Sequence, residues 1–194
     1  MGQGAARRVA LAMENAREGP RREGLVSIII LAKNGEKTIR SLLDGLCSQK
    51  MFERSEVIVI DSGSSDGTLD IVSKFPVTLT QIPPEEFGHG RTRNLGARLA
   101  RGEFLVYVPQ DATPVGPDWL GSLLLPFEDP AVAGVYCRQV PRPDASAMES
   151  CFLLRTYSRR FEVRKLVRRE DASLSACFFS TVGGAVRASL WKEY

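Results

Sequence analysis

The chain has 194 residues, of which 43% are apolar and 25% are charged. This length and near-average composition predict one globular domain with a sizeable core, and they exclude disordered and collagen-like chains. The formal net charge of +3 is too small to indicate nucleic-acid binding, so we expect no nucleic-acid partner. The sequence contains no apolar run of the roughly 18 residues that a membrane-spanning helix needs.

Four cysteines, Cys47, Cys137, Cys151 and Cys177, lie far apart and form no CxxC pair. This spacing favours reduced, mostly buried thiols, and it provides no zinc site. We expect a cytoplasmic protein.

The first 24 residues contain several arginines but no apolar core of signal-peptide length. We expect residues 1–24 to form a leader that is frayed or only loosely docked on the core. The domain itself is expected to span residues 25–194.

From Leu25 onward, β-branched runs alternate with segments of helical periodicity. The predicted elements are strands over 26–31, 57–60, 77–82, 103–108 and 132–139, and helices over 38–49, 68–74, 89–100 and 118–127. Residues 144–171 are helical in places and show no strand signal. This alternation predicts an α/β fold with a mostly parallel sheet. Ligands of such sheets bind at the carboxyl ends of the strands.

The loop 61–67 is the first of these strand ends with informative chemistry. It contains a formal G-x-S-x-G match, which we reject as a hydrolase site because only two strands precede it and the only histidine, His89, comes too early. A carboxylate at Asp61 can accept hydrogen bonds from a base or a ribose, and Gly63 allows close backbone approach. The alternative is that Asp66 merely caps the next helix.

Two further loops are expected at the same edge of the sheet. Asp111 suits a single carboxylate ligand for a divalent cation that also bridges phosphates. His89, Arg91 and Arg93 stand at a predicted helix start, where cations oppose the helix dipole, so a phosphate or base partner is favoured. Because the glycine fingerprints of dinucleotide and P-loop sites are absent, the nucleotide must be held without them.

These segments together resemble the family 2 glycosyltransferases, whose nucleotide-sugar-binding fold is called GT-A. The matching stretches are 26–30, 57–68 and 101–105, while 87–97 and 110–114 are similar to the rhamnosyltransferase-type branch. The resemblance extends from Leu25 to about Trp191.

The resemblance implies roles for individual residues. Asp61 would contact the base of the donor, with Ala32 and Asn34 lining the same pocket, and Arg93 would lie near the base and diphosphate. The remaining implied donor-binding residues are Gly63, Asp66, His89, Arg91 and Gln110. Asp111 matches the second carboxylate of the family's D-x-D motif and would hold Mn²⁺ or Mg²⁺, although Pro109 replaces the first. Gly183, Gly184 and Arg187 would lie on the acceptor side.

Inverting members of that family use a carboxylate as general base, downstream of a tryptophan that matches Trp191. Glu193 is too close to Trp191 to match it, so we expect the base beyond Tyr194 and a chain that is truncated relative to a longer enzyme.

Residues 155–169 combine arginines with apolar residues. They predict either an amphipathic helix packed on the core or a basic face for anionic lipid or an acceptor diphosphate, which would allow peripheral contact with the inner membrane face.

We therefore expect an inverting glycosyltransferase that transfers a sugar, first of all rhamnose from dTDP-rhamnose, to a saccharide or lipid-linked acceptor. The alternatives are a non-catalytic module that binds nucleotide-sugars and, less favoured, a sugar nucleotidyltransferase, which would need a richer glycine loop after the first strand.

Overall fold

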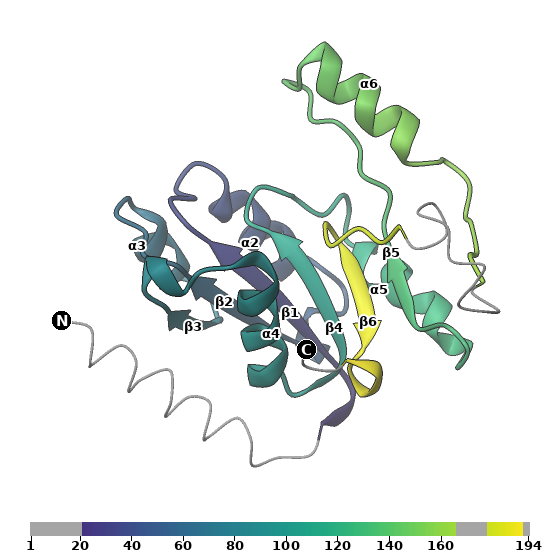
Figure 1. Cartoon of the computed structure of the whole chain (residues 1–194), viewed down its shortest axis with the longest axis horizontal. Coiled ribbons are helices and arrows are strands. Elements are labelled where there is room, and N and C mark those ends of the chain that lie inside the picture. Colours follow the sequence, from purple (N-terminus) through teal and green to yellow (C-terminus); the bar gives the residue numbers. More distant parts are fainter. Residues whose placement is uncertain (1–20, 166–177, 192–194) are drawn as a thin grey trace.

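The computed structural model describes residues 21–165 and 178–191. Within these ranges six strands form one sheet: β1 (Arg22–Ala32), β2 (Ser55–Asp61), β3 (Thr78–Gln81), β4 (Gly102–Pro109), β5 (Gly134–Tyr136) and β6 (Gly184–Arg187). Their order is β3-β2-β1-β4-β6-β5 (Figure 1). The first four strands along this order are parallel, and β6 runs antiparallel to both of its neighbours. The α/β architecture with a mostly parallel sheet is thus confirmed.

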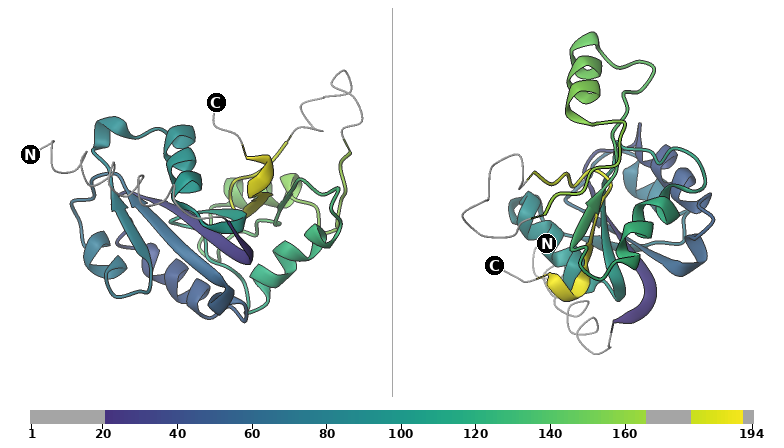
Figure 2. Two further views of the ribbon diagram at one scale, coloured as in Figure 1. Left: turned by 90° about the horizontal axis from the view of Figure 1, so that it is seen from below. Right: turned by 90° about the vertical axis from the view of Figure 1, so that its right-hand side faces the viewer.

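Helices cover both faces of the sheet. The α-helices are α2 (Ile39–Cys47), α3 (Thr68–Val72), α4 (His89–Leu99), α5 (Trp119–Leu124) and α6 (Ala147–Thr156). Short 3₁₀ turns are η1 (Phe52–Arg54), η2 (Pro84–Glu86), η3 (Leu125–Glu128) and η5 (Ala188–Leu190). Figure 2 shows α2, α3 and α5 on one face and α4 on the other, while α6 stands away from the body.

The core consists of two apolar layers, one on each side of the sheet. Ile28 and Ile30 point to the side of α2, whereas Ile29 points to the side of α4, and all three are completely buried. Because successive residues of a strand face opposite sides, a strand covered on both faces must be apolar throughout. This requirement explains the uninterrupted β-branched run in β1.

Each helix and strand predicted between residues 26 and 127 is present, with shifts of a few residues at its ends. The predicted helix 118–127 ends as an α-helix at Leu124 and continues as η3. Pro126 lies in this turn and cannot donate a helical hydrogen bond.

The first strand begins before the boundary that was expected between Gly24 and Leu25. β1 begins at Arg22, whose backbone N–H donates to the Arg101 carbonyl at 2.7 Å. The Arg21 guanidinium donates to three carbonyls at and beyond the end of α4, those of Ala97, Ala100 and Gly102. Residues 21–24 therefore belong to the sheet domain, and residues 1–20 lie outside the described part.

The carboxyl-terminal half differs more from the prediction. The strand expected over 132–139 is reduced to the three residues of β5, and β6 was not predicted at all. β6 is short and contains a glycine, so its sequence has little strand character; pairing with β4 and β5 makes it a strand. Within the described part of the arginine-rich stretch 155–169, Arg155 and Thr156 are helical as the last residues of α6, and residues 166–169 lie outside the described part.

Residues 138–165 form an arm that leaves the sheet after β5, carries α6 and returns (Figure 1). Its base is held by a polar group in which the Gln139 amide donates to the Ser180 hydroxyl at 2.9 Å and to the Tyr157 hydroxyl. Tyr157 is buried, with 7% of its surface exposed, whereas no residue of α6 is buried. The arm is therefore anchored at its base and open to solvent along α6.

The packing of α4 against the sheet yields a stability prediction. A Cβ at Gly96 would overlap the Ile29 side chain and lie 3.3 Å from Ile60 Cδ1. We expect Gly96→Ala to lower the free energy of unfolding by about 1–3 kcal/mol, because the added methyl overpacks this layer. Urea unfolding measures the change.

The matched control lies on the same helix. A Cβ at Gly90 meets nothing within 4 Å, so Gly90→Ala should leave the protein at least as stable, by helix propensity. Equal unfolding midpoints for the Gly96 variant and the wild type would contradict the close packing of α4.

Candidate functional site

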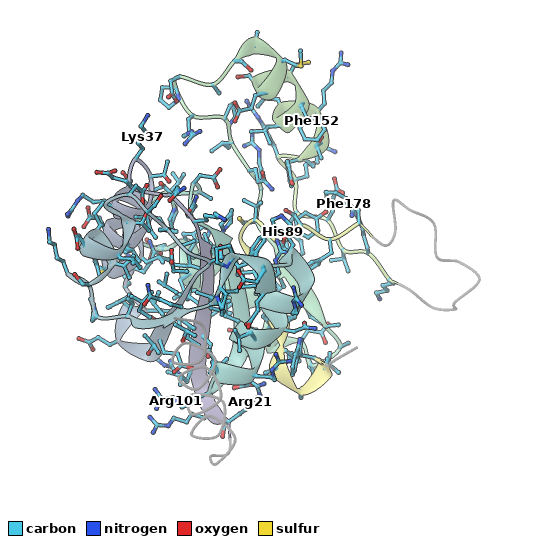
Figure 3. All side chains as sticks on the ribbon, turned by 60° about the vertical axis from the view of Figure 1, so that its left-hand side comes forward. Arg21, Lys37, His89, Arg101, Phe152 and Phe178 are labelled. Atoms are coloured by element: carbon cyan, nitrogen blue, oxygen red, sulfur yellow. The ribbon has the colours of Figure 1, made fainter. Side chains whose placement is uncertain are left out.

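A cavity of about 300 Å³ opens at the carboxyl edge of the sheet, where β1 and β4 end and α4 begins. It is lined by Ile29, Leu31, Ala32, Lys33, Ser62, Phe87, His89, Arg93, Tyr107, Val108, Pro109, Gln110, Asp111 and Thr181. Figure 3 shows His89 well separated from Arg21 and Arg101, which lie at the opposite end of the body. The cavity therefore lies at the edge where the sequence predicted ligand binding.

The loop after β1 forms one wall of the site, and neighbouring loops hold its backbone. Four consecutive N–H groups, those of residues 33–36, each donate to a side-chain oxygen. The acceptors are Gln110 Oε1 at 2.9 Å, Ser64 Oγ at 2.8 Å, Thr68 Oγ1 at 2.7 Å and Asp66 Oδ2 at 3.1 Å. The loops after β1, β2 and β4 are thus fastened together before any ligand binds.

Side chains of the same loop return hydrogen bonds. Asn34 has a φ of +49°, in the left-handed region, and its Oδ1 accepts from the Ser65 N–H at 2.9 Å. The Gln110 amide donates back to the Lys33 carbonyl at 3.0 Å, so that this pair of hydrogen bonds is reciprocal. In this structure the side chains of Asn34 and Gln110 form hydrogen bonds that connect neighbouring loops. Their expected contact with a donor stays a prediction.

Asp61 ends β2 and is completely buried. Its carboxylate accepts from the backbone N–H groups of Gly63 and Ser64, each at 3.0 Å, and from the Ser64 hydroxyl. Gly63 permits this turn because its φ is +86°. In the structure Asp61 shapes its own loop and does not line the cavity, so its role towards a donor base stays a prediction.

Asp66 holds the start of α3. Its Oδ1 accepts from the Thr68 hydroxyl and from the Thr68 N–H at 3.0 Å. The hydrogen bond from the Thr68 hydroxyl is the main cause that lowers the pKa of Asp66 from its ordinary value. Asp66 therefore holds the turn that leads into α3 and does not line the cavity, and its expected role in donor binding stays a prediction.

Three cationic side chains were predicted at the start of α4, and the structure separates them. His89 and Arg93 line the cavity, and the His89 ring makes an edge contact with Phe87, with ring centroids 5.0 Å apart. Arg91 does not line it; its guanidinium donates to the Phe87 carbonyl at 3.3 Å. Within the described residues, no carboxylate forms an ion pair with Arg93, so its guanidinium can bind an anion in the cavity.

Asp111 is exposed at the end of β4 and lines the cavity as predicted. The described ranges contain no group of three or more His, Cys, Asp and Glu side chains that could hold a metal ion by themselves. Asp111 alone could hold an ion of the Mg²⁺ type together with substrate phosphates, because that ion is often held by one or two carboxylates in this way.

Tyr107, which the sequence analysis did not single out, forms part of the cavity from β4. Only 7% of this residue is exposed, and burial raises the pKa of its phenol to about 12, while Arg93 and Arg21 act in the opposite direction. In the sequence, Tyr107 is one of several apolar residues of a predicted buried strand, so nothing there marks it as a site residue. Phe87 was not singled out either, because only the folded chain brings it to this edge, whereas Thr181 belongs to the stretch 181–187 that the resemblance places on the acceptor side.

The predicted acceptor side is only partly at the cavity. Thr181 lines it, but Gly183 and Gly184 do not. Gly183 has a φ of +66°, and a Cβ there would overlap the Cys137 sulfur. Both glycines therefore have a packing role in this structure.

Arg187 does not line the cavity, and its expected acceptor-side role stays a prediction. Its guanidinium donates to the Phe127 carbonyl at 2.6 Å, the Val132 carbonyl at 3.0 Å and the Asp129 carbonyl at 3.1 Å. It also lies over the Phe127 ring, 5.2 Å from the centroid. Because alternate residues of β6 face opposite sides, Arg187 points to the layer beside η3, away from α4 and the cavity.

The described cysteines are free thiols. Cys47 and Cys137 are half-buried, and burial raises the pKa of each thiol. Cys151 is exposed, because it lies on α6, of which no residue is buried. Cys177 lies outside the described residues.

Comparison with known proteins identifies the family. The family model described as "Glycosyl transferase family 2" matches residues 27–179. The O-antigen chain rhamnosyltransferase RfbN of Salmonella typhimurium is 29% identical over 170 residues, which are 87% of this chain and 54% of that protein. The rhamnosyltransferase WbaN of Salmonella anatum is 31% identical over 139 residues, 71% of this chain and 44% of that protein.

Solved structures agree with the fold. A Staphylococcus aureus TarS structure in complex with UDP-GlcNAc has a TM-score of 0.52 and 28% identity, covering 61% of this chain and 37% of that one. A Pyrobaculum calidifontis mannosyltransferase in complex with GDP-Man and Mn²⁺ has a TM-score of 0.55 and 26% identity, covering 78% and 46%.

The chain belongs to glycosyl transferase family 2, and its fold is the GT-A fold of that family. The rhamnosyltransferase-like resemblance stated from the sequence is confirmed by the similarity to RfbN and WbaN. The chain spans about half the length of the curated relatives it matches.

The position of Arg187 predicts a structural phenotype. Arg187→Met should lower the free energy of unfolding by about 2–3 kcal/mol, because three carbonyls lose hydrogen bonds from a charged group. Nucleotide affinity, measured on the folded fraction by calorimetry, should not change. The control is Arg142→Met, which removes only an exposed pairing with Asp144 at 3.9 Å. A loss of nucleotide affinity in Arg187→Met would show that this residue takes part in nucleotide binding.

Proposed function

We propose that this chain is the donor-binding part of an inverting glycosyltransferase of polysaccharide biosynthesis. The donor is a pyrimidine-nucleotide sugar, with dTDP-rhamnose as the first choice, and the acceptor is a saccharide or a lipid-linked saccharide. The observation that carries this proposal is the cavity in which Arg93, His89 and Asp111 meet at the carboxyl edge of the sheet. Such an edge is where α/β sheets bind nucleotides.

The names of the relatives support the choice of donor. TarS was crystallised with UDP-GlcNAc and the mannosyltransferase with GDP-Man, so the proposed ligand class is a nucleotide sugar. Two relatives are named rhamnosyltransferases, which supports rhamnose.

In the proposed reaction an acceptor hydroxyl attacks the anomeric carbon of the sugar. The bond from that carbon to the diphosphate oxygen breaks, its electron pair leaves with the diphosphate, and the hydroxyl proton passes to a base. Arg93 would bind the diphosphate and stabilise its charge as it leaves. The loops after β1, β2 and β4, which are hydrogen-bonded to one another, would hold the donor in one orientation. Less entropy is then lost on reaching the transition state.

A divalent cation fits the same site. Asp111 would hold it together with the donor phosphates, and the cation would neutralise charge on the leaving diphosphate. The Mn²⁺ in the related mannosyltransferase structure supports this part of the proposal.

Nucleotide-dependent stabilisation tests the proposed donor. We expect dTDP and UDP to raise the Tm of the chain more than GDP and ADP do, and Mn²⁺ to increase the shift. A ligand at about 100 times its Kd adds roughly 2.7 kcal/mol to the free energy of unfolding. Asp111→Asn should remove the Mn²⁺-dependent increment, whereas Asp118→Asn, an exposed carboxylate that pairs with Lys50, should leave it unchanged.

The outcomes separate the alternatives. Donor binding without sugar transfer or donor hydrolysis would favour the non-catalytic nucleotide-sugar-binding module. No shift with any nucleotide would overturn the proposal.

We also propose that the arm contacts a membrane that carries anionic lipid. Phe152 and Phe161 are 64% and 74% exposed, and the exposed arginines Arg155, Arg159 and Arg160 lie between them in the sequence. Aromatic side chains with flanking cations are typical of surfaces that lie on anionic bilayers. No helix of the described ranges is long and apolar enough to cross a membrane.

Vesicle sedimentation tests this contact. The chain should bind vesicles with phosphatidylglycerol more tightly than neutral vesicles. Replacing both Arg159 and Arg160 by Gln should weaken binding by roughly tenfold or more, at about 1 kcal/mol per charge. Leu125→Ser, which removes an apolar residue exposed outside the arm, is the control. Equal binding to both kinds of vesicle would contradict the proposal.

A further inference from the structure

The hydroxyl of Tyr107 has no hydrogen-bond partner among the described residues, although more than nine-tenths of the residue is buried. The Tyr107 hydroxyl is not among the completely buried side-chain atoms that lack a partner, so the phenol oxygen is not fully enclosed in the core. Tyr107 lines the cavity. A buried phenol normally finds a partner.

The charges that act on the phenol indicate what it can bind. Arg93 and Arg21 both act electrostatically on Tyr107, and neither is a hydrogen-bond acceptor. With a pKa of about 12, the phenol stays protonated at neutral pH and donates a hydrogen bond. A donating O–H beside a guanidinium suits an anionic oxygen, and a carbonyl or sugar hydroxyl would leave the charge of Arg93 uncompensated.

The position along β4 agrees with this chemistry. Tyr107 is four residues before Asp111 on the same strand end, and Arg93 is about one helical turn after His89 in α4. Arg93 and Tyr107 therefore lie deeper in the cavity than Asp111 and His89, which stand nearer its rim.

We propose that the Tyr107 hydroxyl, together with Arg93, binds a phosphate oxygen of the donor diphosphate. Tyr107 is thus a further donor-binding residue, and this role rests on the proposed function. After sugar transfer the same pair holds the leaving diphosphate. The phenol adds a neutral donor, so it strengthens phosphate binding without adding charge.

Calorimetry with Tyr107→Phe tests this role on the full chain. Phenylalanine keeps the ring that packs beside Ile29, so the Tm without ligand should be close to that of the wild type. We expect the variant to bind dTDP and UDP about tenfold more weakly, the effect of one hydrogen bond to a charged group. Thymidine and uridine should bind both proteins equally, and inorganic pyrophosphate should show the same loss as the nucleotides.

Tyr136→Phe is the matched control, because Tyr136 is half-buried in the aromatic group at the base of the arm and does not line the cavity. It should bind every ligand as the wild type does. The ratio of the wild-type and Tyr107→Phe affinities should also be constant between about pH 6 and about pH 9, since the phenol does not ionise there.

Equal nucleotide affinity of Tyr107→Phe and the wild type would overturn this inference and leave the proposed function standing. An equal loss for thymidine and dTDP would overturn it as well, because the phenol would then act on the base or on packing. Failure of the wild type to bind any nucleotide would overturn the proposed function and this inference together.

Discussion

The candidate site depends on how the backbone after β1 is satisfied. Four consecutive N–H groups of residues 33–36 find their acceptors in side chains from the loops after β2 and β4. Of these four donors the Gly35 N–H is buried, and a buried backbone donor without a partner costs free energy comparable to a lost hydrogen bond. These contacts therefore select one arrangement of three loops, and the cavity between them has its shape before a ligand arrives.

Because of these hydrogen bonds, several polar residues hold the loops together instead of facing the cavity. Asp61, Asp66 and Asn34 are the kind of side chains that bind ligands, yet here their oxygens accept hydrogen bonds from neighbouring loops. The groups free to act on a ligand are instead supplied by α4 and β4, namely Arg93, Tyr107 and Asp111. The site thus separates residues that hold the loops from residues that face the cavity.

The arm has a different physical character from the body. Its base is held by buried polar and aromatic contacts around Tyr157, but the apolar residues of α6 have nothing to pack against within the described residues. Apolar surface of this kind marks an interaction site, and the arginines beside it favour an anionic partner. The proposed donor cavity and the proposed membrane contact are therefore built by different segments, and substitutions can test them separately.

Much of the fold could be predicted from the sequence because its pattern is local. The β-branched run of β1 and the spacing of Leu42, Leu43 and Leu46 in α2 predict a buried strand and a helix without knowledge of their neighbours. The sequence likewise determined the family and the placement of Asp111 and Arg93 at a strand end and a helix start. Only the tertiary structure decided that β6 is a strand, that Arg187 faces away from the cavity and that Tyr107 lines it. These three depend on contacts between residues far apart in the chain, which no local pattern records.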